Sequence, residues 1–245
     1  MSLEEKTDNK KNEQNIKGSE LTGVQKLNDF LQKNRKFLFV GLIALAVIIT
    51  GTIVIISVQE KMQIDAFVKV DQLNLRYEEL QSYIVDNEAE MSSETEAKQT
   101  EIDTLLADLK AFQTKNSGYA AARTYSMSAG IYEARKNWEE AEKAWTSAAK
   151  AAEKTYFAPI CLFHAAVAAE EHGNTESAIN LYTQVMNYDN AFAVAARSQF
   201  SVGRLEESRN NTSAALEAYN NLLNKWPDDP LWINLAQNRI LVLSK

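Results

Sequence analysis

The sequence predicts an all-α protein in which one N-terminal transmembrane helix is followed by a solenoid of helix pairs. Three observations lead to this prediction: an uncharged apolar run near the N-terminus, the absence of glycine and proline between Thr52 and Ser117, and a pattern that repeats every 37 residues in the C-terminal half. A long segment without helix breakers favours helix. No stretch alternates between polar and apolar residues as a half-buried β-strand does.

The apolar run extends from Phe37 to Val58 and contains no charged residue. At about 1.5 Å per residue a helix of this length covers about 33 Å, enough to cross the hydrocarbon core of a bilayer. Lipid offers the backbone no hydrogen-bond partners, so a single span of this kind has to be helical. A cleaved signal peptide has a shorter apolar core and a small-residue cleavage site, which the residues around Val58 lack. We therefore expect an uncleaved membrane anchor.

Basic residues flank the apolar run unequally. Five Lys or Arg residues lie within the twenty positions before it, and three lie within the twenty positions after it. Because cytoplasmic flanks carry the excess of basic residues, we expect the N-terminus in the cytoplasm. The C-terminal domain is then periplasmic, and the protein is a single-pass protein of a bacterial cytoplasmic (inner) membrane.

Two segments are expected before the span. Residues 1–21 are almost entirely polar, which predicts a disordered cytosolic tail. Residues 22–36 place apolar side chains on one helical face, which predicts a short amphipathic lead-in helix. This helix either lies on the inner membrane surface or against a partner, or it is simply the solvated start of the spanning helix. The sequence leaves both interpretations open.

A juxtamembrane helix pair is predicted at residues 59–116. Apolar residues at spacings of three to five continue the first helix out of the membrane to about Asp86, and the polar residues 87–92 interrupt it. A second helix is expected from the S-x-x-E capping box at Ser93 to about Lys115.

The remaining residues, 117–245, contain three copies of one helix-turn-helix pattern, at about 117–155, 156–192 and 193–229, and a final helix at 231–244 that would cap them. In each copy a small residue on the first helix (helix A) faces an alanine on the second (helix B), and an aromatic residue follows that alanine by four positions. Small residues let the two axes approach closely, and the aromatic ring fills the space between them. The recurring residues are Ala129, Ala166 and Gly203 on helix A, and Ala141, Ala178, Ala215, Trp145, Tyr182 and Tyr219 on helix B.

This pattern resembles the tetratricopeptide repeat (TPR), although its spacing of 37 residues exceeds the usual 34. One such pair cannot bury both of its apolar faces alone, so neighbouring pairs must stack. The stack leaves helix A side chains on a concave surface that suits a peptide or a partner helix. Phe163 and Phe200 share one repeat position, where they either form an apolar stripe for a partner or pack between adjacent repeats. We define the concave face as the helix A residues predicted to be exposed there: Arg123, Ser126, Glu133, Phe163, Glu170, Arg197, Phe200, Arg204 and Glu207.

Composition argues against nucleic-acid binding and against catalysis. The whole chain has a net charge of −7 and its first 36 residues carry +2, so the domain after the uncharged span carries −9. Phosphate binding needs clustered Lys and Arg, which this acidic domain lacks. His164 and His172 have no metal-ligand spacing, and Cys161 sits among apolar residues as a small buried hydrophobe does. We find no phosphate-binding loop and no nucleophile elbow, and expect no metal, cofactor or catalytic residue.

The whole layout resembles the ancillary SecYEG translocon subunit family (YfgM-like). The similar segments are LNDFLQKNRKFLFVGLIALAV at the membrane entry and KNSGYAAARTYSMSAGIYEARKNWEEAEKAW in the first repeat. The resemblance implies a short cytosolic lead, one span and an external TPR domain. It also implies association with the Sec translocon, a membrane-anchored chaperone and secreted client chains.

The sequence therefore predicts a non-enzymatic protein–protein interaction adaptor anchored in the membrane. Two alternatives stay open. One is a structural envelope scaffold for outer-membrane assembly or division complexes. The other reverses the topology and makes the repeats a cytoplasm-facing docking platform. The sequence does not indicate an oligomeric state.

Overall fold

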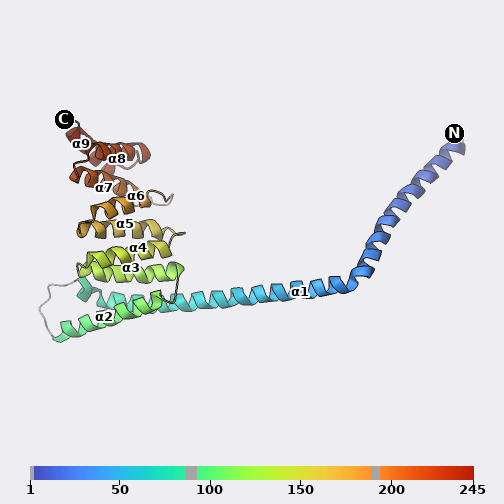
Figure 1. Ribbon diagram of the computed structural model, residues 1–245, viewed down its shortest axis with the longest axis horizontal. Helices are drawn as coiled ribbons and strands as arrows, with labels where there is room; N and C mark the ends of the chain where they lie inside the picture. Colours follow the sequence, from blue (N-terminus) through green and yellow to red (C-terminus); the bar gives the residue numbers. More distant parts are fainter. Residues whose placement is uncertain (1–2, 86–92, 189–193) are drawn as a thin grey trace. The chain divides into compact units, whose positions relative to one another are not determined.

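The computed structural model describes residues 3–85, 93–188 and 194–245 (Figure 1). Every element in these ranges is an α-helix, as the sequence predicts for an all-α solenoid. The chain divides into two compact units, Met1–Met62 and Gln63–Lys245, which we describe separately. The helices are α1 (Leu3–Val85), α2 (Ser93–Gln113), α3 (Gly118–Ala134), α4 (Trp138–Ala151), α5 (Phe157–Glu171), α6 (Thr175–Val185), α7 (Ala195–Ser208), α8 (Thr212–Lys225) and α9 (Pro230–Leu243).

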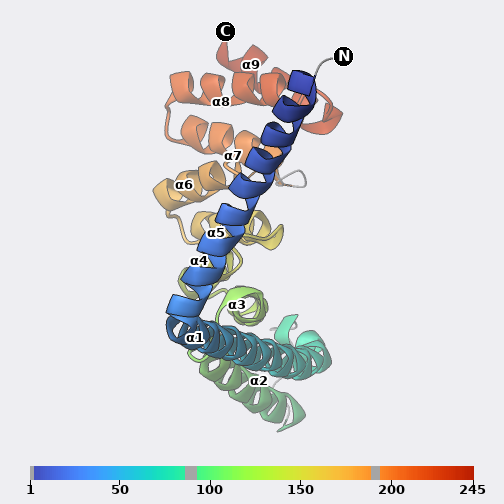
Figure 2. The same cartoon turned by 90° about the vertical axis from the view of Figure 1, so that its right-hand side faces the viewer.

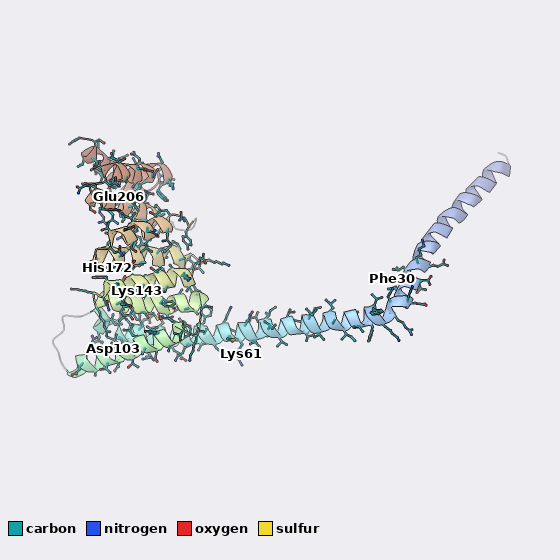
Figure 3. All side chains as sticks on the ribbon, viewed as in Figure 1. Phe30, Lys61, Asp103, Lys143, His172 and Glu206 are labelled. Atoms are coloured by element: carbon teal, nitrogen blue, oxygen red, sulfur yellow. The ribbon has the colours of Figure 1, made fainter. Side chains whose placement is uncertain are left out.

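The first unit is the N-terminal part of α1. Between Gly23 and Ile84, α1 includes the one stretch in the described residues that is long and apolar enough to cross a membrane, with a mean hydropathy of 2.9. Between Phe30 and Lys61, both labelled in Figure 3, the large apolar side chains of α1 are exposed. Phe37, for example, is 80% exposed. This exposure suits a helix that is surrounded by hydrocarbon, and it makes the unit compatible with a single-pass anchor.

One difference from the sequence prediction concerns the tail. The structure places residues 3–21 in α1, where the composition predicts disorder. This segment contains no proline and is rich in Glu and Lys, which have high helix propensity. It also continues a helix that the apolar run already forms, and propagation costs much less than nucleation. Because α1 is continuous, it has no boundary at residues 36, 37 or 58. The division into a lead-in helix, a transmembrane helix and a juxtamembrane helix therefore stays a prediction.

The second unit begins with the C-terminal part of α1, which packs with α2 and α3. Its apolar face contributes Val70, Leu73 and Leu80 to a buried cluster that also contains residues of α2 and α3, among them Leu105 and Ile131. The predicted polar break at 87–92 lies outside the described residues, and α2 begins at Ser93 as expected.

Three ion pairs tie these three helices together. Arg123 of α3 donates to Asp71 of α1 at 2.8 Å and Arg135 of α3 to Asp103 of α2 at 2.8 Å, and Arg76 of α1 bonds Asp108 of α2.

The helix pairs α3/α4, α5/α6 and α7/α8 follow, and they stack in chain order in both views (Figures 1 and 2). Each helix from α2 to α9 contacts the next one, and α9 also contacts α7. The small residues predicted between helices A and B are buried, and Ala129, Ala141, Ala166, Ala178 and Ala215 are all 0% exposed. α9 covers the last pair, with Ala236 buried against Tyr219 and Leu222.

The turn between helices A and B repeats with the same period. Lys136, Gly173 and Asn210 each have a positive φ, at 56°, 83° and 61°. Each is followed by an asparagine that caps helix B, and Asn174 and Asn211 accept hydrogen bonds from backbone N–H groups three residues later. A left-handed residue ends one helix and an asparagine starts the next, so the turn is short and fixed.

Candidate protein-binding surface

A glutamate–aromatic hydrogen bond recurs in all three helix pairs. The indole Nε1 of Trp145 donates to Glu133 at 2.7 Å. The hydroxyl of Tyr182 donates to Glu170 at 2.7 Å, and that of Tyr219 donates to Glu207 at 3.1 Å. Each glutamate stands near the end of helix A, and its aromatic partner follows twelve residues later on helix B. The three carboxylates are therefore placed equivalently along the stack.

Two of these glutamates also receive an arginine from the next helix along the concave face. Arg204 of α7 forms an ion pair with Glu170 of α5, and Arg239 of α9 forms one with Glu207 of α7. Burial, with the bond to Glu170 adding to it, raises the pKa of the Tyr182 hydroxyl. The tyrosine therefore stays a hydrogen-bond donor at neutral pH.

The concave face is hollowed between α5, α6, α7 and α9. The hollow has a volume of about 300 Å³ and combines carboxylates, guanidinium groups and aromatic rings. Four predicted residues meet there, namely Glu170, Arg197, Phe200 and Arg204, and Trp232 of α9 completes the aromatic side. Charged groups beside the half-buried rings of Phe200 and Trp232 suit a polypeptide with both polar and apolar side chains.

Phe163 requires a correction, because it does not face a partner. It is only 5% exposed, packs at 5.6 Å from the ring of Tyr182, and is covered by the guanidinium of Arg197, which lies 4.6 Å from its ring centroid. The alternative in which this residue packs between adjacent repeats is therefore the one observed. Phe200, at the equivalent position, is half-buried between Tyr219 and Trp232, with 5.4 Å between ring centroids in both cases, and still lines the hollow.

Two predicted residues of the first pair form contacts within this protein. Arg123 is half-buried and holds Asp71 of α1, so this guanidinium ties α3 to the juxtamembrane part of α1. The hydroxyl of Ser126 donates to the backbone carbonyl of Arg123 at 2.8 Å. Neither residue lines the hollow.

The histidines and the cysteine are used in packing. His164 stacks on Trp145 with 4.7 Å between ring centroids, and burial lowers its pKa. His172, labelled in Figure 3, contacts Glu142 of the preceding pair at 2.6 Å. Cys161 is fully buried, which raises the pKa of its thiol to about 12. Within the described ranges, no three His, Cys, Asp or Glu side chains are placed to hold a metal ion.

Sequence reasoning missed three contributors to this surface. They are Trp232 and Arg239 of α9, which we expected only to cap the stack, and the contact that Tyr77 of the expected juxtamembrane helix makes with Gly130 on α3. No repeat signal marks these residues, because α1 and α9 do not share the 37-residue pattern. The glutamate–aromatic pairs did carry a signal, since Glu133, Glu170 and Glu207 recur in phase with the aromatic residues.

Comparison with known proteins agrees with this geometry. Over 144 residues the chain is 34% identical to a protein of Treponema pallidum (strain Nichols) named "TPR repeat-containing protein". The match covers 58% of this chain and 59% of that protein, so the chain spans less than two thirds of the curated relative. The sequence matches no family model. The helix stack and this relative together define a TPR-like helical domain.

Proposed function

We propose that this protein is a non-enzymatic, membrane-anchored adaptor that binds protein partners through its concave face. The observation that supports this most is the hollow around Phe200 and Arg204, where charged and aromatic side chains of four helices converge. The similarity to a TPR repeat-containing protein supports a role in protein–protein interaction. The apolar stretch of α1 supplies the anchor.

We further propose a location and partners. The excess of basic residues before the span favours a cytoplasmic N-terminus and a periplasmic C-terminal domain. The resemblance to ancillary translocon subunits supports a role for this domain at the exit of the Sec translocon. There it would receive secreted or membrane protein chains and pass them to a membrane-anchored chaperone.

Site-specific photocrosslinking in intact membranes tests the adaptor surface. We expect a photoreactive amino acid at Phe200 or Arg197 to crosslink to translocon subunits, the chaperone or client chains. Matched control positions are Glu217 and Asn220, which are exposed on helix B of the same pair. Crosslinks of equal yield from both sets of positions would show that the concave face is not the binding surface. Partners from outer-membrane assembly or division complexes would favour the scaffold alternative.

Reporter fusions test the orientation. We expect alkaline phosphatase to be active when fused after Lys245 and inactive when fused after Arg35, because the enzyme matures only outside the cytoplasm. The opposite pattern would place the repeats in the cytoplasm and support the docking-platform alternative.

A further inference from the structure

Among the described residues, Glu133, the first glutamate of the repeated series, has no paired cation, whereas the other two glutamates each have one. Glu170 is paired with Arg204, and Glu207 is paired with Arg239. By the 37-residue repeat, the residue of α5 that corresponds to Arg204 of α7 is Val167. A valine cannot supply a positive charge. Within the described part of the chain, no Lys or Arg forms an ion pair with Glu133.

Glu133 is nevertheless held in a defined position. One carboxylate oxygen accepts the indole N–H of Trp145 at 2.7 Å, and among the described residues no hydrogen-bond donor reaches the other oxygen. Its side chain is partly buried, and burial raises its pKa, an effect that the bond from Trp145 opposes. A half-buried carboxylate with one satisfied oxygen is a strong acceptor for a charged donor.

An aromatic side chain stands beside this carboxylate. The hydroxyl of Tyr77 lies over Gly130, so close that a Cβ at this glycine would be 2.6 Å from it. Glu133 follows Gly130 by three residues and therefore lies on the same face of α3. The pKa of Tyr77 is raised, first by its burial and then by the charge of Glu133. A carboxylate beside a phenol ring suits a guanidinium or an ammonium group, since the ring face also attracts cations.

We infer that Glu133 is the docking point for a basic side chain, arginine or lysine, of a partner polypeptide bound along the concave face. In this arrangement the partner supplies at the first helix pair the cation that the chain itself supplies at the next two. The net charge of −9 on the C-terminal domain attracts a basic segment before it docks. The inference rests on the proposed adaptor function and names the chemistry of the partner.

The test uses the full chain in phosphatidylcholine nanodiscs, whose lipid carries no net charge. The probes are two fluorescein-labelled peptides of nine residues, identical except that the central arginine of one is replaced by citrulline in the other. Citrulline has nearly the shape of arginine but no charge. We expect fluorescence anisotropy to show about tenfold tighter binding of the arginine peptide, which is within the range for a charge-assisted bond.

Three variants locate the preference. Glu133→Gln keeps an acceptor for Trp145 but removes the charge, so both peptides should bind alike. Val167→Arg gives Glu133 the internal partner found in the next pairs, and it should also abolish the preference while Glu133 is intact. Glu217→Gln, at an exposed position of α8, removes one negative charge elsewhere and should leave the preference unchanged. Circular dichroism melting checks that each variant is folded. If Val167→Arg fails this check, Glu133→Gln decides alone.

The outcomes separate the inference from the proposed function. Equal binding of the two peptides to the unmodified chain, or a preference that survives Glu133→Gln, would overturn the inference and leave the adaptor proposal standing. Binding of neither peptide would overturn the inference, and the photocrosslinking at Phe200 would then decide the adaptor proposal by itself. A preference that is lost in Glu133→Gln but kept in Glu217→Gln supports the inference.

Discussion

Helices α5 and α7 occupy the same place in successive repeats, yet they bury different side chains. Cys161 and Leu162 of α5 are replaced 37 residues later by Ser198 and Gln199, and all four are buried. The polar side chains of α7 are satisfied locally: the hydroxyl of Ser198 donates to the carbonyl of Val194 at 2.7 Å, and Gln199 donates to the carbonyl of Ala218 at 3.1 Å.

The difference shows what a repeat position requires. A repeat position requires a buried side chain of a given size. A polar side chain is tolerated there when a backbone carbonyl lies within hydrogen-bonding distance. Gln199 stands where α5 has the apolar Leu162, and its bond to the carbonyl of Ala218 on α8 explains why the pair still packs.

The largest effect on stability is expected at the helix B alanine, which is buried in every repeat. Ala178 is 0% exposed at the contact between α5 and α6, and Ala178→Glu would bury a carboxylate without a partner. We expect a loss of more than about 5 kcal/mol, enough to prevent folding of the stack. Circular dichroism melting of the detergent-solubilised chain measures this. The control Asn180→Glu lies on the exposed side of α6 and should melt normally, and unchanged melting of Ala178→Glu would refute the assigned register.

The two equivalent phenylalanines should differ. Phe163 is buried in the main cluster, so Phe163→Ala should cost about 3–5 kcal/mol of unfolding free energy. Phe200 is only half-buried, so Phe200→Ala should cost less than half as much. Denaturant unfolding of both variants measures the two values. Equal costs would mean that α9 buries Phe200 as completely as α7 buries Phe163.

A smaller effect is expected at the close contact between helices A and B. Gly203 of α7 corresponds to Ala166 of α5, but a Cβ at Gly203 would lie 2.5 Å from the ring of Tyr219. Gly203→Ala should therefore destabilise by about 1–3 kcal/mol, although alanine is the better helix former. In a Tyr219→Leu background the added methyl group should be tolerated better. A stabilising Gly203→Ala would show that the ring can move away freely.

The smallest effect concerns reactivity. Burial raises the pKa of the Cys161 thiol to about 12, so at pH 8 the reactive thiolate is nearly absent and shielded. We expect maleimide labelling of the native chain to be at least about a hundredfold slower than labelling of the chain unfolded in guanidinium. In a Cys161→Ser background, maleimide labelling of a cysteine introduced by Ser198→Cys should be equally slow. Fast labelling at either position would show that its helix opens readily.

Much of the fold was predictable because the repeat is local. A small residue, an alanine and an aromatic ring at fixed spacing are enough to specify one helix pair, and each pair contacts only its neighbours. For this reason Ala141, Ala178 and Ala215 could be placed correctly from spacing alone. The apolar run of α1 was equally clear, because no soluble surface tolerates so long an uncharged stretch.

The candidate site was predictable only in part. Periodicity selected Glu170, Arg197, Phe200 and Arg204, which do meet at one hollow. It also selected Phe163 on the same grounds. Residues 37 apart share a repeat position, but different side chains pack against them. The helix two places further along the stack decides the exposure of each phenylalanine. Arg197 of α7 covers Phe163 of α5, and Trp232 of α9 contacts Phe200 of α7.

The helix pairs and the long apolar stretch of α1 follow from the sequence alone, since they depend on residues close in the chain. Which charges find partners depends on the tertiary structure. Arg204 reaches Glu170, Arg239 reaches Glu207 and Arg123 reaches Asp71, whereas in the part of the chain that the structure describes no arginine pairs with Glu133. These contacts join residues more than thirty positions apart through long side chains, whose endpoints depend on how neighbouring helices stack and not on the local pattern.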